Sequence, residues 1–95
     1  MPPRRPMPPR PEIEKAVLEE LRFIPFDNPT LSSRFNDFWK QIEDQDERTG
    51  RGVRRVDLFL RHLKAKLGPF AVSRDDLIQG SFATVRNLVD EIEGN

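Results

Sequence analysis

The sequence predicts an all-α fold, a small four-helix bundle with one extra short helix. Apolar residues recur at steps of three and four in four separate stretches, the spacing that places them on one face of an α-helix. No stretch of useful length alternates apolar and polar residues as a strand does. A length of 95 residues allows one small domain. We therefore expect a helical bundle domain over 12–95 behind a disordered Pro/Arg-rich tail over 1–11.

The tail MPPRRPMPPRP holds six of the nine prolines of the chain, together with three arginines. Proline is excluded from the interior of a helix or a central strand, so we expect a disordered segment with polyproline II character. Two interpretations stay open. The simpler one is a solubilising leader. The other is a ligand for a proline-recognition groove, through Pro6, Met7, Pro8 and Pro9.

The first helix is expected to begin near Pro11 and to stop at Pro25, because proline fits the first turn of a helix but not its interior. Phe23 and Phe26 are expected to pack over the edge of the bundle. The predicted buried face of this helix is Ile13, Val17, Leu18, Leu21 and Ile24.

The second helix is expected to start at Ser32 or Ser33, since either hydroxyl can cap a helix. Core packing is the simpler interpretation of its aromatic face, and a ligand-binding pocket is the alternative. We expect a solvated acidic loop over 43–52, whose carboxylates lack the spacing of a calcium loop. The aromatic face consists of Phe35, Phe38, Trp39 and Ile42.

The third helix, expected over 53–67, carries an apolar stripe on one face and basic residues on the other. Glycine adopts the backbone conformation that follows the last residue of a helix at little steric cost, and proline cannot continue a helix. The helix should therefore end at Gly68 and Pro69. The stripe consists of Val53, Val56, Leu60, Leu63 and Leu67, with Phe59 beside it.

The remaining chain predicts one short helix and one longer one. Residues 70–72 are a short apolar segment expected to fold back on the core. Ser73 and Asp76 have the spacing of a capping box, and Gly80 should close the turn that they start. We expect Ser81 to cap the last helix, whose apolar face is Phe82, Val85, Leu88, Val89 and Ile92.

Charge is divided unevenly along a chain whose net charge is zero. Residues 51–66 hold six bases and one acid, whereas residues 75–93 hold five acids and one base. Either these faces attract each other, or the basic face docks a protein partner with an acidic surface. Nucleic-acid binding is a further alternative, which the zero net charge disfavours. The candidate contact residues are Arg51, Arg54, Arg55, Arg61, Lys64 and Lys66.

Composition limits the chemistry that the chain supports. It has no cysteine and one histidine, so cysteine-based sites and a histidine metal cluster are excluded. His62 has no motif that supplies it with a nucleophile, and no glycine-rich phosphate loop is present. No apolar run approaches the roughly 18 residues of a membrane span. We expect a cytoplasmic, monomeric protein that is not an enzyme and holds no metal or cofactor.

The segment 56–92 resembles the second half of the acyl and peptidyl carrier protein family. The elements that carry this resemblance read KLGPFAV, SRDDL and SFATVRNLVDEI. The resemblance implies a carrier-like four-helix bundle, with a phosphopantetheine arm on a serine at the start of the long helix. Val53 or Arg55 stands at that position, and neither has the hydroxyl that the arm requires.

Together with the resemblance, these observations predict a carrier-like domain that holds no phosphopantetheine arm. We expect it to act as a docking module through its basic third helix. The alternative is a functional acyl or aminoacyl carrier that is modified at an atypical serine. Ser32 and Ser33 are the candidate phosphopantetheine sites for that alternative, because the sequence places them at an expected helix start. Both also have a sufficient structural role as helix caps.

Overall fold

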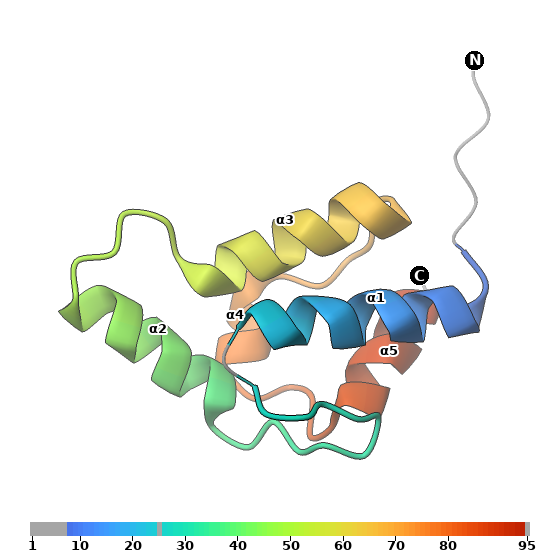
Figure 1. The fold of residues 1–95 in the computed structure, drawn as a ribbon, viewed down its shortest axis with the longest axis horizontal. Coiled ribbons are helices and arrows are strands. Elements are labelled where there is room, and N and C mark those ends of the chain that lie inside the picture. The colour runs from blue at the N-terminus through green and yellow to red at the C-terminus, as the bar shows by residue number, and fades with distance from the viewer. Residues whose placement is uncertain (1–7, 25, 95) are drawn as a thin grey trace.

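A computed structural model describes residues 8–24 and 26–94, over which the chain forms five α-helices and no strand (Figure 1). The predicted all-α class and the small helical bundle with one extra short helix are therefore confirmed. The expected disordered tail falls largely on residues 1–7, which lie outside the described residues, as does Pro25. The helices are α1 (Arg10–Phe23), α2 (Phe38–Arg48), α3 (Arg55–Leu67), α4 (Arg74–Ile78) and α5 (Val85–Glu93).

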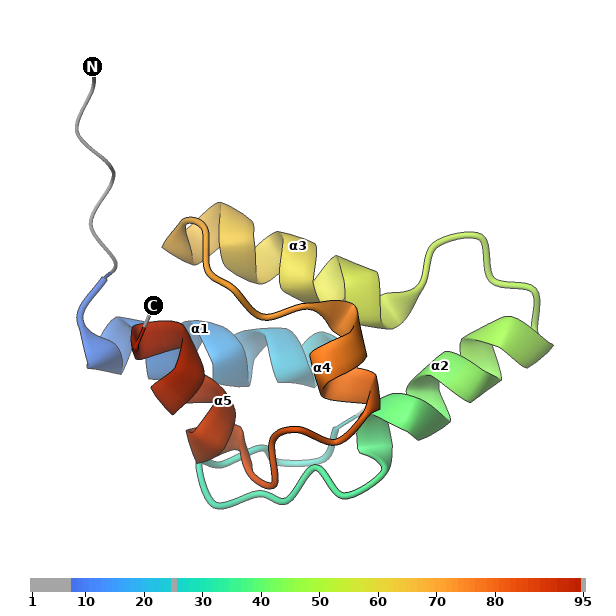
Figure 2. The ribbon, with the colours of Figure 1, turned by 180° about the vertical axis from the view of Figure 1, so that it is seen from behind.

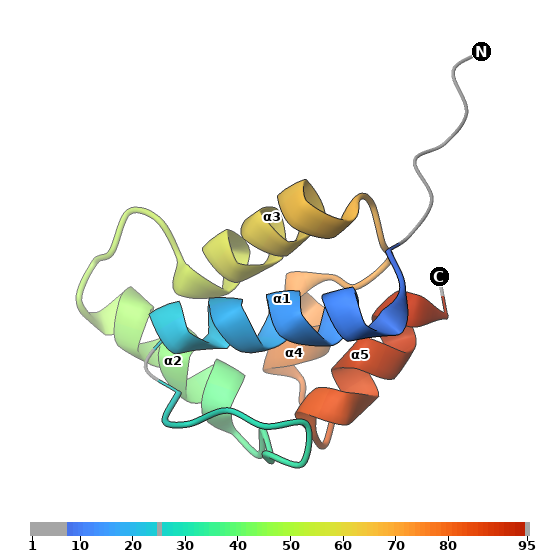
Figure 3. The same ribbon diagram turned by 45° about the vertical axis from the view of Figure 1, so that its right-hand side comes forward.

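Helix α1 lies between its two main neighbours, α3 on one side and α5 on the other (Figures 1 and 3). It runs antiparallel to α3. Helix α2 packs against α3 and α4, and α4 lies behind α1 in the view of Figure 1, so that Figure 2 shows it in front. No helix in the described part of the chain is long and apolar enough to cross a membrane.

The core is built from the predicted apolar faces. In α3 the stripe is buried as expected, except that Val53 precedes the helix and is 51% exposed. Phe70 and Val72 fold back onto the core, as predicted for the segment after α3. Buried residues of the three central helices are Ile13, Ala16, Val17, Leu21, Val56, Phe59, Leu60, Leu63, Leu67, Val85, Leu88, Val89 and Ile92.

Helix α1 begins at Arg10, one residue before the start that we expected near Pro11. An ion-pair cluster joins this first turn to the end of α5. The Arg10 guanidinium lies 2.7 Å from an Asp90 carboxylate oxygen and 3.2 Å from one of Glu93. These contacts fix the start of α1 against the end of α5.

The predicted start of the second helix is wrong, because residues 31–32 form a turn and residues 33–35 form an isolated bridge rather than a helix. This segment bridges residues 83–85, with the Phe35 N–H donating to the Ala83 carbonyl at 3.0 Å. The Ser33 carbonyl accepts the Val85 N–H, also at 3.0 Å. The Leu31 carbonyl likewise accepts the Arg86 N–H. Two backbone N–H groups in the first turn of α5, those of Val85 and Arg86, therefore have acceptors outside the helix.

Because of the same bridge, the last helix begins later in the chain than we expected. Ser81 does not cap it; Thr84 does, in a capping box with Asn87. The box predicted for α4 is confirmed, since Ser73 and Asp76 bond each other's backbone N–H groups. Gly68, at φ 88°, ends α3 as expected.

Two expectations about loops are also corrected. Helix α2 continues to Arg48, so most of the expected acidic loop is helical, and the connection to α3 is residues 49–54. Phe23 does not pack over the bundle edge but is 82% exposed. Phe26 does pack, edge to face with Phe35 and Phe38.

Leu63→Ala should lower the free energy of unfolding by about 2–5 kcal/mol, because it leaves a cavity at a fully buried position of α3. Val53→Ala is the matched control, and we expect its effect to stay within about 0.5 kcal/mol. Urea unfolding followed by circular dichroism measures both. Equal effects of the two substitutions would contradict the described burial of the α3 stripe.

Candidate interaction surface

The six basic residues nominated as partner contacts lie on α3 and in the loop before it. The structure brings four of them to carboxylates of the same chain and leaves two without a carboxylate partner among the described residues. The acids that pair with them come from α1 and α2, and not from 75–93 as one interpretation of the sequence required.

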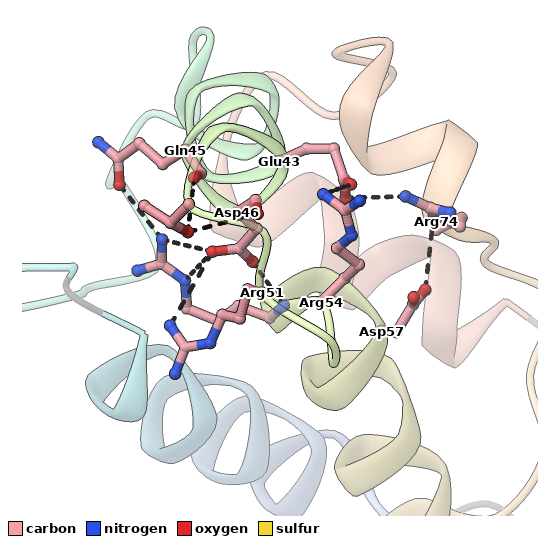
Figure 4. Close-up of polar contacts among 9 residues, drawn as sticks. Glu43, Gln45, Asp46, Arg51, Arg54, Asp57 and Arg74 are labelled. Carbon is pink, nitrogen blue, oxygen red and sulfur yellow. Dashed lines mark hydrogen bonds and ion pairs between the residues drawn. The ribbon is translucent and has the colours of Figure 1, made fainter.

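Arg55 is bound most completely, through the buried carboxylate of Asp46. Figure 4 labels Asp46, which lies at the end of α2. Asp46 is 1% exposed. One of its oxygens accepts the Arg55 backbone N–H at 2.8 Å, and the other lies 2.8 Å from Nε and 2.7 Å from Nη2 of Arg55. Asp46 therefore caps the N-terminus of α3 from another helix, where the helix dipole favours negative charge.

The protonation of Asp46 reflects two opposed effects. Burial alone raises the pKa of its carboxyl, but the hydrogen bonds from the side chain and backbone of Arg55 outweigh burial. The pKa of Asp46 consequently lies below the ordinary aspartate value. Arg51 assists from 3.9 Å.

Arg54 belongs to a second group of ion pairs that joins three helices (Figure 4). One Glu43 oxygen lies 3.2 Å from Arg54 Nη1, and the other lies 2.8 Å from Arg74 Nη2. Arg74 Nε in turn lies 3.5 Å from Asp57. Arg54 Nη1 is buried without an aligned hydrogen bond in the described chain, so its attraction to Glu43 is mainly electrostatic.

Lys66 pairs with Glu20 of α1, a carboxylate that is 4% exposed. The ammonium lies 2.9 Å from one Glu20 oxygen, and His62 Nδ1 lies 3.2 Å from the other. The hydrogen bond that the Lys66 ammonium donates to Glu20 raises the pKa of Lys66. Lys66 therefore fastens α3 to α1.

Arg61 and Lys64 are the two nominated bases without a carboxylate partner in the described chain. Arg61 is exposed and, over the residues that the structure describes, makes no hydrogen bond or ion pair. The Lys64 ammonium lies 5.4 Å from the centre of the Phe70 ring, within the range of a cation–π contact. Both side chains border a surface hollow of about 400 Å³. The hollow is lined by Asp57, Leu60, Arg61, Lys64, Val72, Ser73 and Arg74.

The two candidate serines do not begin a helix. Ser33 is half-buried, and its hydroxyl accepts the Thr30 N–H at 2.9 Å. Ser32 is exposed in the turn before the bridged segment. At the start of α3, Val53 is exposed and Arg55 is engaged by Asp46. Across 8–24 and 26–94 no group of three His, Asp or Glu side chains is placed to hold a metal ion.

The aromatic face of α2 mainly builds the core. Trp39 is 2% exposed, with its ring centre 4.6 Å from that of Phe59 and 5.6 Å from that of Phe35. Phe38 is half-buried at its edge. A shallow hollow of about 320 Å³ lies beside Phe26, Phe35 and Phe38, but Trp39 does not line it.

The carboxylates that bind the basic residues are the functional groups that the sequence interpretation missed. The spacing of apolar residues in the sequence does indicate these buried acids. Asp46 follows Trp39 and Ile42 at steps of three and four, and Glu20 follows Val17 by three. An acid that continues an apolar stripe is placed in the core, where it requires a basic partner.

Asp46→Ala should lower the free energy of unfolding by about 3–5 kcal/mol, because it leaves Arg55 half-buried without its partner and removes the cap of α3. Asp44→Ala, two residues away on the exposed face of the same helix, should change it by less than about 0.5 kcal/mol. Chemical unfolding measures both variants. If Asp46→Ala behaved like Asp44→Ala, the buried ion pair would not support the fold.

The contribution of Asp46 should also depend on pH. Its pKa is lower in the folded chain than in the unfolded one, so its stabilisation is complete above the unfolded value of about 4 and is lost as the pH falls through the folded value. We expect the stability difference between the native chain and Asp46→Asn to shrink on acidification below about pH 4. Urea unfolding over a pH series tests this, and a difference that stays constant would exclude the linkage.

No family model matches this chain, and no curated protein or solved structure matches it at a significant level. The resemblance of 56–92 to carrier proteins therefore stays a prediction that rests on the sequence pattern alone.

Proposed function

We propose that this chain is a non-catalytic docking module that binds an acidic surface of a protein partner through helix α3. The observation that carries the proposal is the division of the basic residues. Arg54, Arg55 and Lys66 each lie within 3.2 Å of a carboxylate of the chain's own α1 or α2. Arg61 and Lys64 are exposed and have no such partner in the described chain.

This division narrows the contact surface that the sequence suggested. The three paired bases hold α3 in the bundle, so their charge is already largely neutralised. Arg61 and Lys64 stand three residues apart on α3 and are therefore neighbours on the helix surface. An acidic partner would find its strongest attraction there, and the attraction would weaken as salt is added.

The alternative functions gain less support. A phosphate backbone needs several free bases along a surface, whereas most of the nominated bases are occupied internally. The carrier alternative requires a serine at the start of a helix, and neither Ser32 nor Ser33 has that position. We therefore propose docking as the function.

The proposal predicts a specific photo-crosslink from α3. A photoreactive residue at exposed Ala65, next to Lys64, should crosslink to one protein in the native host. The protein would be identified by mass spectrometry and its binding repeated with purified components. Arg61→Glu with Lys64→Glu should weaken that binding about tenfold, as expected for losing two exposed ion pairs.

The matched control is Lys40→Glu with Arg86→Glu, which changes the net charge equally at two exposed bases outside α3. We expect this variant to bind as the native chain does. Equal losses in the two variants would show a general charge effect and contradict docking through α3, as would the absence of any crosslink from Ala65.

A further inference from the structure

We propose that the hollow between α3 and α4 is a receptor site for the carboxylate side chains of an acidic, leucine-containing helix of a protein partner. This inference rests on the proposed function and assigns its site and the chemistry of its ligand. The two helices that form the hollow lie side by side in Figure 2, with α4 in front.

Positive charge enters the hollow from both helices. Arg61 and Lys64 stand on α3, and Arg74 stands on the first turn of α4. The one acid among the lining residues, Asp57, is paired with Arg74 Nε at 3.5 Å. Arg74 is also paired with Glu43 at 2.8 Å, so the free positive charge at the hollow comes from Arg61 and Lys64, and these two bases favour an anionic group.

Two of these bases already contact other side chains of the chain. Arg74 is fixed by Glu43 at 2.8 Å as well as by Asp57 (Figure 4). Lys64 lies over the Phe70 ring at 5.4 Å. These contacts restrict the side chains before a ligand binds, so binding should lose less of their conformational freedom.

The other lining residues indicate a peptide rather than a nucleic acid. Leu60 and Val72, both buried, are the apolar residues among those that line the hollow, and Ser73 also lines it with its hydroxyl used in the α4 cap. No aromatic side chain is among the lining residues, so a base has no ring on which to stack. A carboxylate beside an aliphatic side chain matches both the basic and the apolar residues of this lining.

The spacing of the bases suggests a helical ligand. Arg61 and Lys64 are three residues apart, which places their Cβ atoms about 5–6 Å from each other. Glutamates three or four residues apart on a partner helix have the same separation. Such a helix can therefore contact both bases while a leucine from the same face approaches Leu60 and Val72.

A titration with defined peptides tests the site. The probe is a helical peptide of glutamate, leucine and alanine with glutamates three and four residues apart, and its control carries glutamine at every glutamate. We expect the glutamate peptide to shift the backbone amide signals of Arg61, Lys64, Val72 and Arg74 in an NMR titration. The glutamine peptide should leave them unchanged.

Two variants sharpen the result. Arg61→Glu with Lys64→Glu should weaken the glutamate peptide about tenfold, and Lys40→Glu with Arg86→Glu should bind it as the native chain does. Circular dichroism of each variant checks that the fold is retained. Equal weakening by both variants would overturn the site.

The outcomes also separate this inference from the proposed function. Shifts confined to α3, with Val72 and Arg74 unmoved, would overturn the hollow but leave docking through α3 intact. A crosslinked partner with no response to the glutamate peptide would do the same. Tighter binding of a labelled single-stranded or duplex oligonucleotide than of the peptide would overturn the inference in favour of nucleic acid. Loss of both the crosslink and the peptide shifts would overturn both proposals.

Discussion

The buried ion pair between Asp46 and Arg55 is the constraint on which the placement of α3 depends. A carboxylate that is 1% exposed cannot remain charged in the core unless its oxygens are bonded. Arg55 supplies both a guanidinium and a backbone N–H. The same carboxylate stands near the end of α2 and caps the start of α3, so it joins the two ends of the connection at 49–54.

The distribution of the other charges follows from the same requirement. Glu43 and Glu20 are also largely removed from solvent; Glu43 pairs with Arg54, directly before α3, and Glu20 pairs with Lys66 of α3. The basic face of α3 is therefore not wholly a binding face, because Arg55 and Lys66 pair with acids of the interior. The two bases that no interior acid requires, Arg61 and Lys64, are the ones available to a partner. Stability and recognition are thus divided between residues of one helix.

Most of the fold could be predicted from the sequence, because helices are encoded by local periodicity. The stripe of α3, the capping box of Ser73 and the stop at Gly68 all depend on neighbours within a few residues. The starts of α2 and α5 could not be predicted in this way. They are set by the bridge between Arg34 and Thr84, which joins segments 50 residues apart, and serine caps compete with that bridge. The ion pairs between helices could not be predicted either, because periodicity describes each helix by itself. An acid on an apolar stripe indicates only that some base must pair with it.

The cluster at Arg10 has a consequence for the connectivity of the chain. It brings the first turn of α1 and the last turn of α5 within reach of a single side chain. A short linker from Gly94 to Pro9 would therefore close the folded unit into a ring with little strain. Because closing the ring restricts the unfolded chain far more than the folded one, cyclisation would stabilise this domain through entropy, with no new contact in its interior.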